Sequence, residues 1–258
     1  MQPPHSPPQT VCLLRLSAIG DTCHVVPLLR ALQRAWPDTR FTWVIGRIES
    51  RLLSLLPEVE FITVDKRAGL AGLRALRGQL RDRRFDALLD LQVSVRASLV
   101  AACIPARIRL GFDRARAREG QWLVTNARIA PREREHVQDS FMGFARWFGV
   151  EPGTPIWDVP LPADAVAYAE RLIPAGNTLV ISPCSSHRLR NWRAERYAAV
   201  ADHAVERHGM RVILTGGPAP LEREMADAIV AAARVPIVDQ VGKDTLPQLL
   251  ALLARASV

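Results

Sequence analysis

The sequence has few cysteines, and they do not form the pairs that metal or redox sites use. Cys12, Cys23, Cys103 and Cys184 are far apart, without a Cys-x-x-Cys motif. The spacing therefore indicates neither a zinc site nor a redox centre. Small secreted domains are much richer in cysteine, so we expect these residues to be free thiols of a cytosolic protein.

Long apolar runs are also missing, and none of them could span a bilayer. Residues 1–10, MQPPHSPPQT, contain four prolines. They lack the basic start and hydrophobic centre of a secretion signal, so we expect a disordered tail. The chain has 258 residues, of which 48% are hydrophobic. It can therefore bury a substantial core in one large domain or in two smaller ones.

Lysine is nearly absent, since Lys66 and Lys243 are the only two, and arginine supplies the rest of the positive charge. Lysine and arginine together number 34 against 26 acidic residues, which gives a net charge of +8. Such an excess fits nucleic acid, an anionic membrane surface or phosphorylated substrates. A GC-rich genome also favours arginine, so charge alone selects no partner. Aromatic residues are not interleaved with basic ones as in single-strand binders, which argues against nucleic acid.

The first half of the chain alternates short apolar segments with amphipathic ones. This alternation predicts βαβ units, that is, a parallel sheet with helices on both faces. Residues 111–135 are rich in arginine and predicted to be irregular. The predicted strands are residues 11–16, 40–45, 61–64, 87–91 and 107–110, and the predicted helices are residues 21–36, 49–56, 70–83, 94–103 and 136–148.

A proline-rich segment divides the chain, and the α/β pattern restarts after it. Residues 150–162 contain four prolines and one glycine, which is typical of a linker. We therefore expect a first domain over residues 11–152, a linker over 153–162 and a second domain over 163–258. The second domain offers strands at 178–182, 211–214 and 236–238, and helices at 163–172, 194–208, 221–233 and 246–254. Three strands make a small sheet, so we expect this domain to be incomplete.

The loop after the first predicted strand carries a carboxylate. Ser17, Ala18, Ile19 and Gly20 form a turn of small and apolar residues before Asp21. The carboxyl ends of parallel strands are where such sheets bind ligands. A purely structural explanation is equally good, because an acidic residue in the first turn of a helix is stabilised by the helix dipole.

Three stretches of the sequence form one combination: residues 17–21 with Pro27, residues 111–113 with 117–119 ahead of His136, and residues 181–186 with 190–192 and 195–197. In these stretches the chain resembles glycosyltransferase family 9, the bacterial heptosyltransferases that build the lipopolysaccharide inner core. The resemblance runs from residue 11 to residue 258. It implies the GT-B architecture, in which two Rossmann-like domains face a cleft. Typical members continue into an Asp-x-Gly-x-x-His-like loop that this sequence lacks, so the second domain is expected to be incomplete, as a fragment or a natural truncation.

The resemblance implies transfer of heptose from ADP-heptose to the Kdo or heptose unit of the inner core, with inversion and without a metal or another cofactor. Asp21 matches the proposed base of the family, and a carboxylate can take the proton of an attacking hydroxyl. Arg190 matches a cation placed near a helix start. There it would stabilise the negative charge that develops on the departing diphosphate.

The resemblance also implies two groups of binding residues. Surface arginines and glycine turns occur for structural reasons too, so each of these assignments has a structural alternative. The acceptor residues would be Ser17, Ala18, Arg67 and Arg118, and the donor residues would be Ser185, Ser186, Arg190, Gly216, Gly217, Glu222, Lys243 and Asp244.

Two other classes of function remain open at this point. One is a GT-B module that binds nucleotide or saccharide without catalysis, and the other is a basic RNA-binding protein. The expected location is the cytoplasm, with peripheral contact to the inner membrane, because the acceptor is lipid-anchored and the chain is cationic. The sequence does not specify the heptose linkage, the acceptor unit or the oligomeric state.

Overall fold

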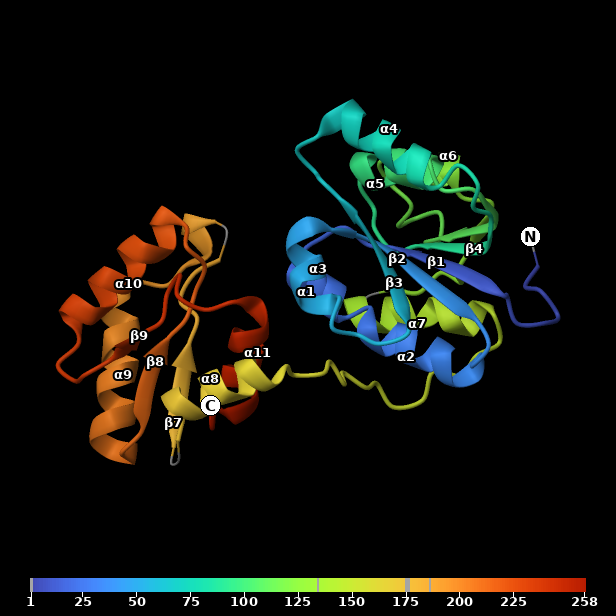
Figure 1. Ribbon diagram of the computed structural model, residues 1–258. Coiled ribbons are helices and arrows are strands. Elements are labelled where there is room, and N and C mark those ends of the chain that lie inside the picture. Colours follow the sequence, from blue (N-terminus) through green and yellow to red (C-terminus); the bar gives the residue numbers. More distant parts are fainter. Residues whose placement is uncertain (1, 134, 175–176, 186) are drawn as a thin grey trace. The chain divides into compact units, whose positions relative to one another are not determined.

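The chain forms two compact units, Met1–Pro160 and Leu161–Val258 (Figure 1). The computed structural model describes residues 2–133, 135–174, 177–185 and 187–258. Each unit contains one parallel sheet with helices packed on it. The architecture is α/β with two Rossmann-like parts, as the sequence predicts.

The first sheet has six parallel strands in the order β3-β2-β1-β4-β5-β6. The chain runs outward from β1 to β3, returns to the other side of β1, and then runs outward again. The strand order therefore reverses between β1 and β4, and this is the switch point where open α/β sheets bind ligands. The strands are β1 (Thr10–Leu14), β2 (Arg40–Gly46), β3 (Val59–Val64), β4 (Phe85–Asp90), β5 (Ala106–Gly111) and β6 (Ala127–Arg128).

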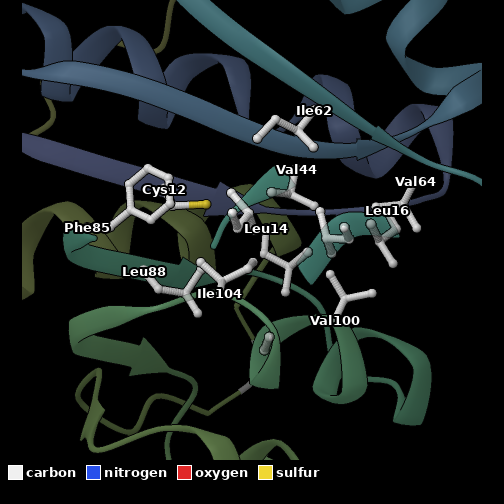
Figure 2. Close-up of a cluster of buried hydrophobic side chains, with 13 residues drawn as sticks. Cys12, Leu14, Leu16, Val44, Ile62, Val64, Phe85, Leu88, Val100 and Ile104 are labelled. Atoms are coloured by element: carbon white, nitrogen blue, oxygen red, sulfur yellow. The ribbon is translucent and has the colours of Figure 1, made fainter. Parts of the chain in front are cut away.

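Helices cover both faces of this sheet, with α4, α5 and α6 on one face and α2 and α7 on the other (Figure 1). Leu14 and Leu88 of the central strands and Val100 of α5 are fully buried in one hydrophobic cluster between the sheet and its helices (Figure 2). The helices are α1 (Ile19–Cys23), α2 (Val26–Ala35), α3 (Arg47–Leu53), α4 (Gly69–Gln79), α5 (Val95–Ala102), α6 (Gln121–Val124) and α7 (Val137–Trp147).

The predicted helix over residues 21–36 is wrong in one respect, because it is broken into α1 and α2. Pro27 lies in the first turn of α2. It has no N–H to donate to the carbonyl of Cys23, four residues earlier, so one helical bond is missing there. The indole N–H of Trp157 donates to that carbonyl instead, at 3.1 Å.

Two other expectations are corrected in the first unit. Residues 111–135 are not irregular throughout, since they contain α6 and β6. Both elements are too short to show a periodic pattern. Residues 8–10 are not a free tail, since Thr10 begins β1 and the Pro8 carbonyl accepts the Thr39 hydroxyl at 2.6 Å. Asp158, which lies in the expected linker, pairs with Arg30 of α2 at 2.6 Å.

The second unit is a three-stranded parallel sheet in the order β7-β8-β9. Helices α9 and α10 pack on one face, and α8 and α11 pack on the other. Val180 of β7 donates its N–H to the Val258 carbonyl at 2.9 Å. The elements are β7 (Thr178–Ile181), β8 (Arg211–Leu214), β9 (Val238–Asp239), α8 (Ala163–Leu172), the short 3₁₀ helix η1 (Arg188–Arg190), α9 (Ala194–His208), α10 (Pro220–Ala232) and α11 (Leu246–Arg255).

The buried cluster under α4 and α5 should dominate the stability of the first unit. Leu14 is fully buried in its central strand, so Leu14→Ala leaves a cavity and should lower the free energy of unfolding by about 3 kcal/mol. Leu70→Ala is the control, because that side chain is 71% exposed and its loss should change stability by less than about 0.5 kcal/mol. Urea unfolding followed by circular dichroism measures both, and equal effects would contradict the assigned core.

Candidate active site

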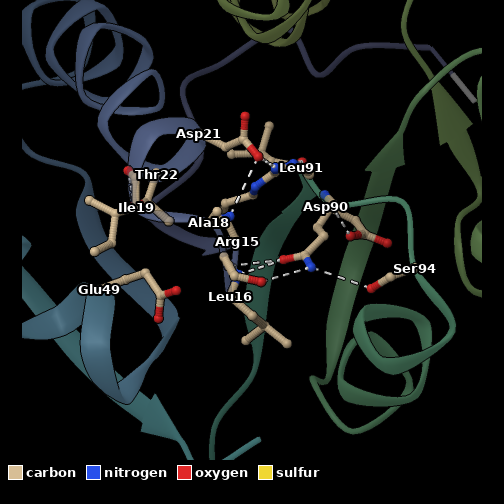
Figure 3. Close-up of polar contacts among 12 residues, drawn as sticks. Arg15, Leu16, Ala18, Ile19, Asp21, Thr22, Glu49, Asp90, Leu91 and Ser94 are labelled. Carbon is tan, nitrogen blue, oxygen red and sulfur yellow. Dashed lines mark hydrogen bonds and ion pairs between the residues drawn. The ribbon is translucent and has the colours of Figure 1, made fainter. Parts of the chain in front are cut away.

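Two loops meet at the switch point of the first sheet, one after β1 and one after β4. Gln92 joins them, because its side-chain oxygen accepts the N–H of Leu16 at 2.7 Å and that of Ser17 at 3.3 Å. Its side-chain nitrogen contacts the hydroxyl of Ser94, the N-cap of α5, at 3.4 Å (Figure 3). A single amide therefore fixes the Ser17 loop against the start of α5.

Asp21 lies beside this junction, in the short helix α1. Its Oδ2 accepts a hydrogen bond from the guanidinium of Arg15 and lies 3.4 Å from the N–H of Ala18 (Figure 3). The Asp21 side chain is 40% exposed, whereas that of Arg15 is only 12% exposed. The carboxylate is thus held on one side by a buried cation and remains open to solvent on the other.

Arg15 is itself fixed from three directions. It donates to the Leu91 carbonyl at 2.6 Å, and its guanidinium carbon lies 5.5 Å from the centre of the Phe141 ring. Burial lowers the pKa of this guanidinium, and the neighbouring Asp21 counteracts that effect. An unpaired cation in this position would be costly, so Arg15 and Asp21 depend on each other.

A second carboxylate is fully buried next to this site. Asp90 ends β4 and has no exposed surface. Burial raises its pKa to about 7. Its Oδ2 has no hydrogen-bond partner among the described residues, and its backbone carbonyl accepts the side-chain amide of Gln121 at 3.0 Å. Asp90 therefore retains a proton over much of the acidic range.

Arg15, Asp90 and Gln92 were not singled out from the sequence, although each gives a weak signal. Arg15 directly follows the apolar run that forms β1, and Asp90 and Gln92 lie at the end of the apolar run that forms β4. A polar residue at the carboxyl end of a buried strand faces the ligand edge of a parallel sheet.

The expected acceptor residues occupy different surroundings. Ser17 and Ala18 form the loop beside Asp21. Arg67 and Arg118 are exposed, and their guanidinium groups form no ion pair within the described parts of the chain. No hydrogen bond or ion pair of the described residues joins either arginine to Asp21.

In the second unit, the loop after β7 is folded on itself. The N–H of Ser185 donates to the side chain of Asn191 at 2.7 Å, and the Ser185 hydroxyl donates to the His187 carbonyl at 3.1 Å. Arg190 ends η1 and is exposed, without an ion pair among the described residues. Ser186, expected to contact the donor phosphates, lies outside the described residues.

The loop after β8 is closed by Glu222 of α10. Its Oε2 accepts the N–H of Gly217 at 2.6 Å. A Cβ at Gly216 or Gly217 would lie 2.7 or 2.8 Å from the carboxylate oxygens, so a larger residue at either position would displace the Glu222 side chain from this loop. The carboxylate expected to reach the nucleotide is thus engaged with this loop.

Lys243 and Asp244 follow β9, near the same edge of the second sheet. The ammonium group of Lys243 donates to the Asp239 carbonyl at 2.7 Å and pairs with the Asp239 carboxylate at 3.4 Å. Asp244 is partly buried, which raises its pKa to about 6. The structure therefore gathers the expected donor residues that it describes at the carboxyl ends of β7, β8 and β9.

The buried carboxyl group of Asp90 should make the stability of the protein depend on pH. Its pKa is raised in the folded state, so the stability it contributes is present below about pH 4 and is lost as the pH rises toward 7, by up to about 4 kcal/mol. Asp90→Asn should remove this loss and be more stable than the original protein at pH 8. Urea unfolding at pH 5 and pH 8 measures it, with exposed Asp82→Asn as the control. An unchanged pH dependence in Asp90→Asn would contradict the assignment.

Comparisons with known proteins agree with this arrangement. A sequence model of glycosyltransferase family 9 (heptosyltransferase) matches residues 73–258. The lipopolysaccharide core heptosyltransferase OpsX of Haemophilus influenzae is 38% identical over 252 residues, which are 97% of this chain and 72% of that protein. Lipopolysaccharide heptosyltransferase 3 of Escherichia coli is 23% identical, over 92% of this chain and 72% of that protein.

Solved structures show the same fold. A family 9 glycosyltransferase from Veillonella parvula superposes with a TM-score of 0.83 at 22% identity, covering 96% of this chain and 74% of that one. The heptosyltransferase WaaC of E. coli, solved with ADP, gives 0.77 at 23% identity, covering 96% and 79%. The fold is therefore that of GT-B heptosyltransferases. Together with the family match over residues 73–258, these similarities show that the chain belongs to glycosyltransferase family 9.

Proposed function

We propose that this protein is an inverting, metal-independent glycosyltransferase that moves heptose from ADP-heptose to the Kdo or heptose unit of the lipopolysaccharide inner core. The observation that carries the proposal is the half-exposed Asp21 carboxylate at the switch point of a family 9 chain. WaaC has been solved with ADP and with ADP-2-deoxy-2-fluoro heptose, which supports an ADP-sugar as the donor.

Asp21 is proposed to act as the general base. Arg15 and Ala18 engage its Oδ2, while Oδ1 accepts no hydrogen bond from the described residues. An acceptor hydroxyl can therefore donate to Oδ1. As the hydroxyl oxygen bonds to the anomeric carbon, its proton moves to Asp21 and the bond from that carbon to the ADP oxygen breaks. Arg15 then has a positioning role, because it fixes the carboxylate that receives the proton.

The second unit is proposed to bind the donor. Arg190 would neutralise charge on the departing ADP, which is the main electrostatic contribution available without a metal ion. Its guanidinium, which forms no ion pair with the described residues, follows the loop after β7, where a diphosphate can also reach backbone N–H groups. We propose that Ser185, Ser186, Gly216, Gly217, Glu222, Lys243 and Asp244 complete the donor site.

The acceptor is proposed to bind in the first unit, along the loop of Ser17 and Ala18. Arg67 and Arg118 are proposed to contact its carboxylate or phosphate groups, for which a guanidinium is well suited. We propose a cytoplasmic location with peripheral contact to the inner membrane, since this acceptor is lipid-anchored. Within the described residues, no helix has both the length and the apolar character that crossing a bilayer requires.

Loss of the proposed base should stop transfer without unfolding the protein. Asp21→Asn should lower kcat by about 10²–10⁴-fold, while exposed Asp38→Asn should leave it unchanged. Incubation with ADP-heptose and a defined Kdo-lipid A acceptor, followed by mass spectrometry, measures the product. Full activity of Asp21→Asn would remove the assigned base. ADP binding without any transfer by the original protein would instead indicate a non-catalytic module.

The proposed donor cation has a matched control in the same 3₁₀ helix. Arg190→Gln should weaken ADP binding by about 10–100-fold, because a charge-assisted hydrogen bond to phosphate is lost. Arg188→Gln should have little effect, since the Arg188 guanidinium pairs with Glu224 at 2.9 Å. Isothermal titration with ADP measures both variants. Equal losses in the two would contradict a specific role for Arg190.

A further inference from the structure

Three helices on one face of the first sheet contain no acidic residue. The segments are GLAGLRALRGQ in α4, VRASLVAA in α5 and QWLV in α6. They lie side by side over the sheet (Figure 1). The charged side chains that these helices present are therefore all positive, although the chain as a whole has 26 acidic residues.

The exposed side of α4 is a stripe of arginines. Leu70, Arg74, Arg77 and Arg81 are spaced by four, three and four residues, which puts them on one side of the helix and its end. Like charges at such spacing destabilise a helix, so the stripe is not explained by the stability of α4. Arg74, Arg77 and Arg81 line a groove of about 1080 Å³ between the ends of α4 and α5, together with Arg84 and Arg107.

These groove arginines have no acidic partner. All five are exposed, and none of them forms an ion pair among the residues that the structure describes. The one acid that lines the groove, Asp86, already accepts the backbone N–H groups of Gln9 and Thr10, at 2.9 and 3.0 Å. The guanidinium groups therefore remain available for phosphate.

Apolar side chains are exposed on the two neighbouring helices, α5 and α6. Trp122 and Leu123 of α6 are 54% and 68% exposed, and Val95 and Leu99 of α5 are 58% and 50% exposed. The two helices are tied together, because the Ser98 hydroxyl donates to the Glu119 carbonyl at 3.0 Å. Exposed apolar side chains that gather in this way mark a contact surface.

The apolar part of this surface lies at the edge of the sheet that carries Asp21. Helices α4, α5 and α6 begin at the carboxyl ends of the strands, so Leu70, Val95 and Trp122 lie near that edge. Ser94, which caps α5, shares Gln92 with the Ser17 loop. The arginine groove lies at the opposite edge, at the starts of β4 and β5.

We infer that this surface, named here the α4–α6 face, docks on an anionic phospholipid bilayer. The face is formed by Leu70, Arg74, Arg77, Arg81, Val95, Leu99, Trp122 and Leu123. Tryptophan and aliphatic side chains partition into the interface, and arginines bind the headgroup phosphates. Nucleic acid would satisfy the arginines but offers nothing to exposed leucine and valine. Lipid docking would bring the lipid-anchored acceptor to the Asp21 edge, and only this consequence rests on the proposed function.

Vesicle binding tests the inference without any transfer reaction. The protein should sediment with vesicles of phosphatidylcholine and phosphatidylglycerol, and much less with phosphatidylcholine alone. Arg74→Gln, Arg77→Gln and Arg81→Gln combined should lower the partition coefficient by about 100-fold at physiological salt. Trp122→Ser should also lower it, and this part of the loss should persist at high salt because it is not electrostatic.

A matched triple variant distinguishes the contribution of the α4–α6 face to vesicle binding from that of the net charge of the protein. Arg51→Gln, Arg207→Gln and Arg211→Gln combined remove the same charge from exposed positions elsewhere and should retain binding within about threefold. Equal losses in the two triple variants, or equal binding to both kinds of vesicle, would overturn the inference. So would displacement from vesicles by a single-stranded RNA that binds more tightly. Thermal unfolding confirms that each variant is folded. Vesicle binding with no heptose transfer would contradict the proposed function alone.

Discussion

The ion pair between Arg15 and Asp21 is the interaction on which the candidate active site depends. Arg15 is brought to the carboxyl end of the central strand, where its side chain is almost fully covered. A guanidinium in such a place needs a carboxylate, and Asp21 supplies it from the first turn of α1. The need to neutralise Arg15 at this edge of the sheet therefore fixes the position of the proposed base.

The sheet topology determines what surrounds that pair. Leu14 of β1 is paired with Asp90 of β4, and this register brings Gln92 against the loop that begins at Leu16. In the second unit, loops after three parallel strands carry the expected donor groups by the same geometry. Each unit thus places its own candidate residues at the edge where its parallel strands end.

The strands of both sheets, apart from the two-residue β6, could be predicted because they are short, mostly apolar runs. The placement of Asp21 at the sheet edge could be predicted because it follows the first of these runs. The role of Gln92 could not, since its partners lie about seventy-five residues away and local patterns do not contain a strand register. The break between α1 and α2 was not predicted, although Pro27 is a sequence signal for it. Helix α6 was missed because Trp122 and Leu123 are exposed, so its four residues show no amphipathic pattern.

The bond between Trp157 and the Cys23 carbonyl has a mechanical consequence. Cys23 ends α1, two residues after Asp21, and Trp157 lies in the segment that leads out of the first unit. A displacement of that segment must either break this bond or pull on the end of α1. The chain segment that connects the two units therefore also restrains the helix that carries the proposed base.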